Sequence, residues 1–148
     1  MDSYKHILVG LDLTGECPDI LQKAVALAQC CGADVSVAHV IEPLTFAYGG
    51  DMPVDLSEIQ DQLQLKAEQE LIRLVKQVDC KIEQQHILVG QPATELHNLA
   101  QQLGADLIAV GSHGRKGFAL LLGSTSNSVL HGANRDVLAI RVSPTMPE

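Results

Sequence analysis

The chain has 148 residues, enough for one compact domain that buries on the order of 70% of the surface its unfolded form exposes. Hydrophobic residues make up 46% of the chain but aromatic residues only 3%. We therefore expect a core of Leu, Ile, Val and Ala, and no aromatic surface for single-stranded nucleic acid. Ten Lys and Arg against eighteen Asp and Glu give a formal net charge of −8. This charge argues against binding to bulk nucleic acid or to anionic membranes.

The cysteines and the apolar runs give no sign of export or of a metal centre. Cys17, Cys30, Cys31 and Cys80 form no Cys-x-x-Cys pair and no Cys/His group at zinc-ligand spacing, and we expect small buried thiols. No apolar run approaches the roughly 18 residues of a membrane span. We therefore expect a cytoplasmic protein that forms a single domain over residues 1–148.

The first half of the chain alternates strand-like and helical patterns. Lys5 to Asp12 is a short, almost wholly apolar run that ends in an acid, which is typical of a strand buried on both faces. Pro18 begins a helical pattern that stops at Gly32, and a second strand follows from Asp34 to Glu42. The next helix extends from Asp55 to Val78. Its expected apolar face consists of Leu56, Ile59, Leu63, Ala67, Leu71, Leu74, Val75 and Val78.

The second half repeats this alternation. The patterns predict a strand over Lys81–Val89, a helix from Pro92 that ends at Gly104, and a strand over Asp106–Val110. A short helix over Ser124–His131 and a last strand over Val137–Val142 follow. Five strands that alternate with four helices predict an α/β fold. We expect a Rossmann-like five-stranded parallel sheet, in the flavodoxin-like order 3-2-1-4-5, with helices on both faces.

In such a sheet, ligands bind beyond the carboxyl ends of the strands where the winding direction reverses, here between the first and fourth strands. Those two ends read Gly10-Leu11-Asp12 and Val110-Gly111-Ser112-His113-Gly114, so an acid faces a glycine-rich turn. Further on, the segment Gly123-Ser124-Thr125 begins the expected short helix, where free N–H groups and hydroxyls can hold a phosphate. The glycines would equally serve a sharp turn, and composition does not decide between these roles.

Several nucleotide-binding and phosphate-accepting classes are disfavoured. The chain has no Gly-x4-Gly-Lys-Ser/Thr motif, and no Gly-x-Gly-x-x-Gly follows the first strand. These absences argue against a P-loop enzyme and a dinucleotide dehydrogenase. A phosphoacceptor receiver domain would need an Asp at the end of the third strand, where this chain reads Val89-Gly-Gln-Pro92.

Over nearly its whole length the chain resembles the universal stress protein family. The family pattern has an acid at the end of the first strand, a His-Val-type ending to the second, and Gly-x2-Gly-x9-Gly-Ser/Thr after the fourth. The matching residues are Asp12, His39-Val40, and Gly111-Ser-His-Gly114 followed by Gly123-Ser124. The chain departs from the pattern in one respect, because eight residues instead of nine separate Gly114 from Gly123.

This resemblance implies a universal stress response protein that binds an adenine nucleotide, either ATP or AMP, and acts as a regulatory module. Mg²⁺ would accompany ATP. Asp12 would approach the ribose hydroxyls, the Val40 backbone would recognise adenine, and the helix that starts at Gly123 would hold phosphates. The nucleotide-binding residues expected in full are Gly10, Leu11, Asp12, Val40, Val110, Gly111, His113, Gly114, Arg115, Gly123, Ser124 and Thr125.

Two other functions stay open: a slow ATP hydrolase that uses the same crevice, and a stress protein that binds no nucleotide and acts through its dimer surface. No residue set argues for an efficient catalyst, since His113 has no matching acid or nucleophile near it in the sequence. Arg115 either offsets phosphate charge or is only solvated. The resemblance also implies a homodimer through Val137–Val142, an apolar strand at an open sheet edge.

Overall fold

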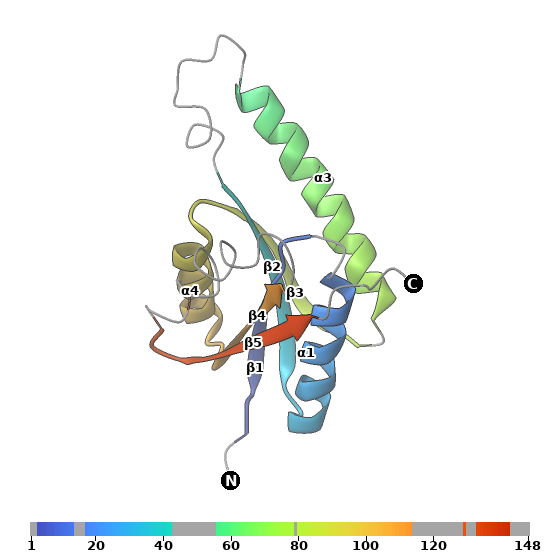
Figure 1. Ribbon diagram of the computed structural model, residues 1–148, viewed down its shortest axis with the longest axis vertical. Coiled ribbons are helices and arrows are strands. Elements are labelled where there is room, and N and C mark those ends of the chain that lie inside the picture. The colour runs from blue at the N-terminus through green and yellow to red at the C-terminus, as the bar shows by residue number, and fades with distance from the viewer. Residues whose placement is uncertain are drawn as a thin grey trace.

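The computed structural model describes residues 3–13, 17–42, 56–78, 80–113, 129 and 133–142. In chain order its elements are β1 (His6–Gly10), α1 (Cys17–Cys31), β2 (Asp34–Ile41), α3 (Leu56–Gln77), β3 (Ile82–Val89), α4 (Pro92–Leu103), β4 (Leu107–His113) and β5 (Asp136–Val142) (Figure 1). These elements match the expected ones to within a few residues. The largest difference is at β4, which continues past Val110 to His113 because it stays paired with β5 there. Apart from Val129, the expected helix over 124–131 lies outside the described residues.

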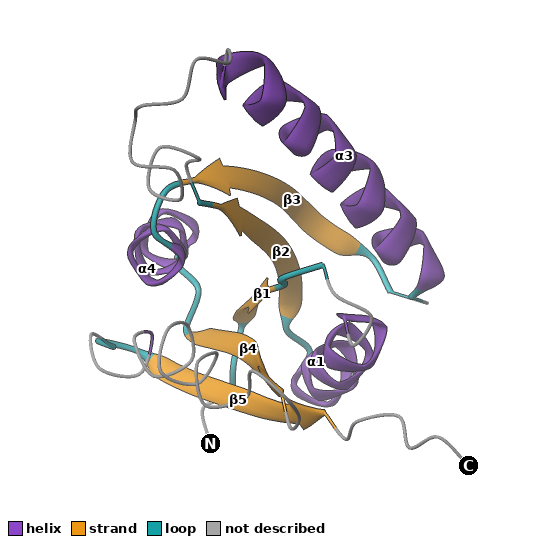
Figure 2. Ribbon diagram, turned by 45° about the horizontal axis from the view of Figure 1, so that its top comes forward, coloured by secondary structure: helices purple, strands orange, loops and turns teal. Residues whose placement is uncertain are grey.

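The five strands form one parallel sheet in the order β3-β2-β1-β4-β5, which confirms the expected fold. β1 is the central strand of the sheet, and its residue Ile7 pairs with Val35 of β2 on one side and with Leu107 of β4 on the other. Helices α1 and α3 lie on one face of the sheet and α4 lies on the opposite face (Figure 2). The winding direction reverses at β1, and therefore a crevice is expected beyond its carboxyl end.

Two apolar clusters hold the helices to the sheet. Side chains of successive strand residues point to opposite faces, so Ile7 and Val9 join the cluster with α1 and α3 while Leu8 joins the cluster with α4. All three side chains are fully buried. The strand is therefore covered on both faces, as its apolar run predicts.

The N-terminal segment is tied to the starts of two other strands. The backbone N–H groups of Lys5 and His6 donate to the carboxylate of Asp106, just before β4, at 3.0 to 3.2 Å. The Tyr4 hydroxyl donates to Asp136 Oδ2 at 2.8 Å, and this hydrogen bond raises the pKa of Tyr4 because it stabilises the protonated phenol. These bonds fix where β1 begins, and they help to place its carboxyl end.

Helix α3 is buried over less of its length than the apolar spacing predicts. Ala67, Leu71 and Leu74 are buried in the α3 interface, but Ile59 and Leu63 expose 39% and 40% of their surface. The first half of the helix reaches past the ends of the strands (Figure 1). The expected apolar face of α3 is therefore only partly buried, because the apolar repeat continues where the helix has left the sheet.

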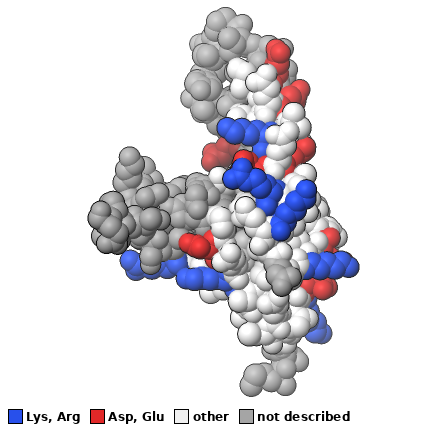
Figure 3. Space-filling view, turned by 90° about the vertical axis from the view of Figure 1, so that its right-hand side faces the viewer, with Lys and Arg blue, Asp and Glu red and all other residues white. Residues whose placement is uncertain are grey.

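The outward side of α3 carries charges of both signs. Lys or Arg and Asp or Glu are interspersed along the helix instead of forming patches of one sign (Figure 3). The ion pair between Arg73 Nη1 and Glu70 Oε1 is 3.9 Å long and lies on this exposed surface. Such a pair contributes little to stability, so the charged side of α3 is solvated and the buried leucines hold the helix in place.

The expectation of buried thiols is wrong for the cysteines whose side chains are described. Cys30 is exposed, and Cys31 and Cys80 are half-buried. Cys30 comes two residues after the buried Ala28, and a step of two residues in an α-helix leads to the far side of the helix. A small apolar residue in a helical pattern is thus no guarantee of burial.

Candidate functional site

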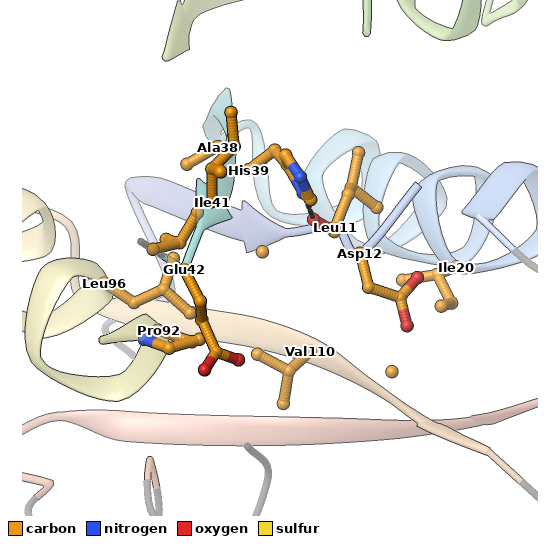
Figure 4. A pocket seen from close by; sticks show the side chains of 13 residues that line it. Leu11, Asp12, Ile20, Ala38, His39, Ile41, Glu42, Pro92, Leu96 and Val110 are labelled. Atoms are coloured by element: carbon orange, nitrogen blue, oxygen red, sulfur yellow. Dashed lines mark hydrogen bonds between the residues drawn. The ribbon is translucent and has the colours of Figure 1, made fainter. Parts of the chain in front are cut away.

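A pocket of about 390 Å³ lies at the carboxyl ends of β1, β2 and β4, within the size range of about 300–1,000 Å³ that is usual for small-molecule sites. Half of the expected site residues line it: Gly10, Leu11, Asp12, Val40, Val110 and Gly111. They lie at the ends of three neighbouring strands, and Figure 4 shows Leu11, Asp12 and Val110 among them. The structure therefore brings together the residues that flank the reversal of winding.

The other expected site residues do not line the described pocket. His113 is the last residue of β4, two positions beyond Gly111. Gly114, Arg115, Gly123, Ser124 and Thr125 lie outside the described residues. The expected phosphate-binding segment thus stays a prediction.

Several pocket residues were missed by sequence reasoning. Ile20 comes from the first turn of α1, Pro92 and Leu96 come from the start of α4, and Ala38, Ile41 and Glu42 come from β2 or directly follow it. One signal could have found the helical residues. In a β-α unit the helix begins at the carboxyl edge of the sheet, so the first turns of α1 and α4 border a site located there.

The two pocket glycines allow helices to approach the sheet closely. A Cβ atom on Gly10 would lie 2.9 Å from Leu96 Cδ1, closer than real side chains pack. A Cβ atom on Gly111 would overlap Cδ1 of Ile20 and lie 3.2 Å from its Cγ1. Both glycines therefore have a packing role at the pocket wall, because a larger residue at either position would displace a helix side chain.

The backbone of Val40 lies just past the end of the β1–β2 ladder. The last pair is Gly10 with Ala38, and the Leu11 N–H donates to the Ala38 carbonyl at 2.9 Å. Alternate residues of a strand direct their N–H and C=O groups to the same side, so Val40 faces the same side as Ala38. Strand β1 ends at Gly10, and Leu13, three residues further on, has a φ of +60°. Val40 lines the pocket, and among the described residues no backbone hydrogen bond joins it to this segment, so we infer that its N–H and C=O are open toward the pocket.

The polar side chains of the pocket are two carboxylates and an imidazole. Asp12 and Glu42 are exposed at its mouth, with Val110 between their carboxylates in Figure 4. His39 is half-buried, and its Nδ1 lies 2.7 Å from the Leu11 carbonyl oxygen. The described lining includes no Lys or Arg. This part of the site therefore suits a ligand region that offers hydroxyl or amine donors and an apolar surface, and it does not suit an anion.

Within the described residues, no group of three or more His, Cys, Asp or Glu side chains could hold a metal ion. No helix in that part of the chain is both long and apolar enough to cross a membrane.

The model of the universal stress protein family matches residues 3–141 of the chain. Universal stress protein A homolog 2 of Coxiella burnetii is 40% identical over 147 residues, which cover 96% of this chain and 98% of the homologue. The chain belongs to the universal stress protein family.

Solved structures of the family share the fold. One, a universal stress protein in complex with cAMP, has a TM-score of 0.63 and 22% identity. Another, the universal stress protein from Archaeoglobus fulgidus in complex with dAMP, has a TM-score of 0.59 and 21% identity. Each similarity covers 95% of this chain and 99% of the other protein. At these identities the similarity establishes the fold and does not by itself carry a ligand over to this chain.

Proposed function

We propose that the protein binds an adenine nucleotide in the pocket between β1 and β4 and acts as a regulatory module of the stress response. The observation that carries this proposal is the Val40 backbone edge, a donor beside an acceptor at the end of the ladder. Adenine offers the complement, a ring-nitrogen acceptor beside an exocyclic amine donor, whereas guanine has an oxygen in place of that amine. The cAMP and dAMP in two relatives support an adenine ligand.

The remaining pocket residues fit the other parts of a nucleotide. Ala38, Leu96 and Val110 form an apolar wall for the faces of the base, and Gly10 and Leu11 lie beside it. The Asp12 carboxylate accepts hydrogen bonds from ribose hydroxyls. Gly111, His113, Gly114 and Arg115 would border the ribose and phosphates. The phosphates would bind at Gly123, Ser124 and Thr125, where the sequence predicts the start of a helix. ATP would bring Mg²⁺ with it on its phosphates.

Calorimetric titration of the full chain with ATP, ADP and AMP, each with and without Mg²⁺, tests the proposal. We expect at least one of them to bind with a stoichiometry of one per chain, and GMP to bind at least tenfold more weakly. The absence of binding for all three adenine nucleotides would overturn the proposal and favour a protein that acts through its dimer surface. Phosphate release measured on the same samples would identify a slow ATP hydrolase.

Replacing Asp12 by Ala is expected to weaken AMP binding about tenfold, or about 1.4 kcal/mol, because hydrogen bonds to a charged acceptor are lost. Inorganic phosphate should bind as before. Glu42→Gln is the matched control, since it removes an exposed carboxylate at the same mouth. A parallel loss of AMP and phosphate binding would mean that Asp12 supports the loop and does not contact the ribose.

Gly123→Val is expected to weaken binding of AMP at least tenfold while the domain stays folded. A β-branched side chain would crowd the proposed phosphate site, whereas the sheet core is made of other residues. Affinity for adenosine, which has no phosphate, should change little. Unchanged AMP affinity in a folded variant would contradict the phosphate assignment.

We also propose a homodimer through β5, which pairs only with β4 in the described sheet and leaves its other edge open. Ala139 is exposed on this strand, and Ala139→Pro is expected to give monomers because proline removes a backbone donor and distorts the edge. Multi-angle light scattering at micromolar concentration measures this. The control is Gln85→Pro on β3 at the opposite edge, which should leave the dimer intact. A monomeric unmodified protein would refute the dimer.

A further inference from the structure

We propose that His39 is a positioning residue: its imidazole ends the β1–β2 ladder by taking the Leu11 carbonyl, and so keeps the Val40 N–H available to the base. The ligand part of this inference rests on the proposed function, but the exchange of hydrogen-bond partners does not. The starting observation is the 2.7 Å contact between His39 Nδ1 and the Leu11 carbonyl oxygen, drawn as a dashed line in Figure 4.

The regular geometry of a parallel sheet identifies the bond that His39 replaces. Each strand residue that faces its neighbour pairs its C=O and N–H with residues on either side of its partner. Ala38, the partner of Gly10, accepts from the N–H of Leu11 at 2.9 Å. On the next rung, two residues along β2, the N–H of Val40 would donate to the carbonyl of Leu11. In the described structure that carbonyl lies 2.7 Å from His39 Nδ1, and within the described residues it accepts no backbone bond from Val40.

The chemistry of the two groups fixes the proton. A carbonyl oxygen only accepts hydrogen bonds, so His39 must donate through Nδ1. In the neutral ring the proton is then on Nδ1, and Nε2 is left as an acceptor. The His39 side chain therefore supplies the same kind of N–H donor that the Val40 backbone would have supplied.

This exchange has two consequences for the pocket. Among the described residues the N–H of Val40 makes no bond to the segment after β1, and we infer that it is open to the pocket that Val40 lines. The same bond holds the peptide group between Leu11 and Asp12, in the segment that carries the proposed ribose carboxylate. Without the imidazole donor, the Leu11 carbonyl would accept from the Val40 N–H, and the β1–β2 ladder would be one hydrogen bond longer. The Val40 N–H would then no longer be available to donate to adenine.

A purely structural role for His39 makes a different prediction. If the imidazole only satisfies a carbonyl at the rim of the sheet, its removal leaves the carbonyl to water and does not change Val40. Whether the Val40 N–H becomes hydrogen-bonded to the Leu11 carbonyl therefore separates the two roles, and this can be measured without any nucleotide.

The first measurements use the ligand-free, ¹⁵N-labelled full chain. Ring ¹⁵N shifts are expected to place the His39 proton on Nδ1, and amide exchange at Val40 is expected to slow at least tenfold in His39→Leu. His39→Asn should exchange like the unmodified protein, because its amide nitrogen is as many bonds from the backbone as Nδ1. A neutral ring protonated on Nε2, or unchanged Val40 exchange in folded His39→Leu, would overturn the inference. The ring measurement needs no variant, so it decides the donor even if His39→Leu does not fold.

The second measurement adds ligands. His39→Leu is expected to weaken AMP at least tenfold and leave ribose 5-phosphate, which has no base, unchanged, while His39→Asn restores AMP affinity. Equal loss for both ligands would contradict a role at the base edge. Failure of the unmodified protein to bind any adenine nucleotide would refute the proposed function alone, since the tautomer and the Val40 exchange would still report on the ladder.

Discussion

Replacing Leu71 by Ala is expected to lower the free energy of unfolding by about 2–5 kcal/mol. Leu71 is 1% exposed and lies in the cluster between α1, α3 and the sheet, so its truncation leaves a cavity. The adjacent Ile72 is 46% exposed, and Ile72→Ala should change stability by no more than about 0.5 kcal/mol. Urea unfolding of both variants, with the slope of the transition compared as well as its midpoint, measures the difference.

The pair of variants also tests whether α3 is solvated in solution. A cost for Ile72→Ala as large as that for Leu71→Ala would mean that the outward side of α3 is covered by another molecule. A small cost for Leu71→Ala would mean that α3 packs less firmly on the sheet than its buried leucines indicate.

The strands and their order were predictable because buried strands and helices have characteristic patterns of apolar residues along the chain. A strand covered on both faces, such as β1, needs a continuous apolar run, and parallel strands need helical crossovers between them. The exposure of Ile59 and Leu63 was not predictable in the same way. Helical periodicity reports which side of a helix is apolar, but it does not report where the neighbouring sheet ends.

The strand ends of the pocket were predictable for a similar reason. Asp12 and Gly111 follow from the topology, because the order of strands determines which carboxyl ends meet, whereas Val40 was expected from the resemblance to the family. The contacts between distant residues that close the pocket were not predictable from the sequence. Leu96 packs on Gly10 from 86 positions away in the chain, and the bond from His39 to Leu11 spans 28 positions. Such pairs depend on how closely helices and strands approach, which no local spacing encodes.

Gly111→Ala is expected to destabilise the fold by about 1–3 kcal/mol, because the added methyl group competes for space with a packed side chain. The Cβ atom would overlap Cδ1 of Ile20, a fully packed residue of α1 that is 1% exposed. Strain in the Gly111 backbone does not contribute, since its φ is outside the left-handed region. Because both residues line the pocket, we also expect the displaced Ile20 side chain to weaken AMP binding.

Ile20→Val removes the overlapping Cδ1 atom and provides a test of this cause. Alone, it should cost about 0.5–1.5 kcal/mol as a loss of buried methyl surface. Combined with Gly111→Ala, it should relieve the overlap, so that the double variant is more stable than the sum of the two single changes predicts. Urea unfolding and AMP titration of all four proteins measure both effects. Strict additivity would show that α1 accommodates the methyl group by shifting, and that the close approach of Ile20 to Gly111 does not shape the pocket.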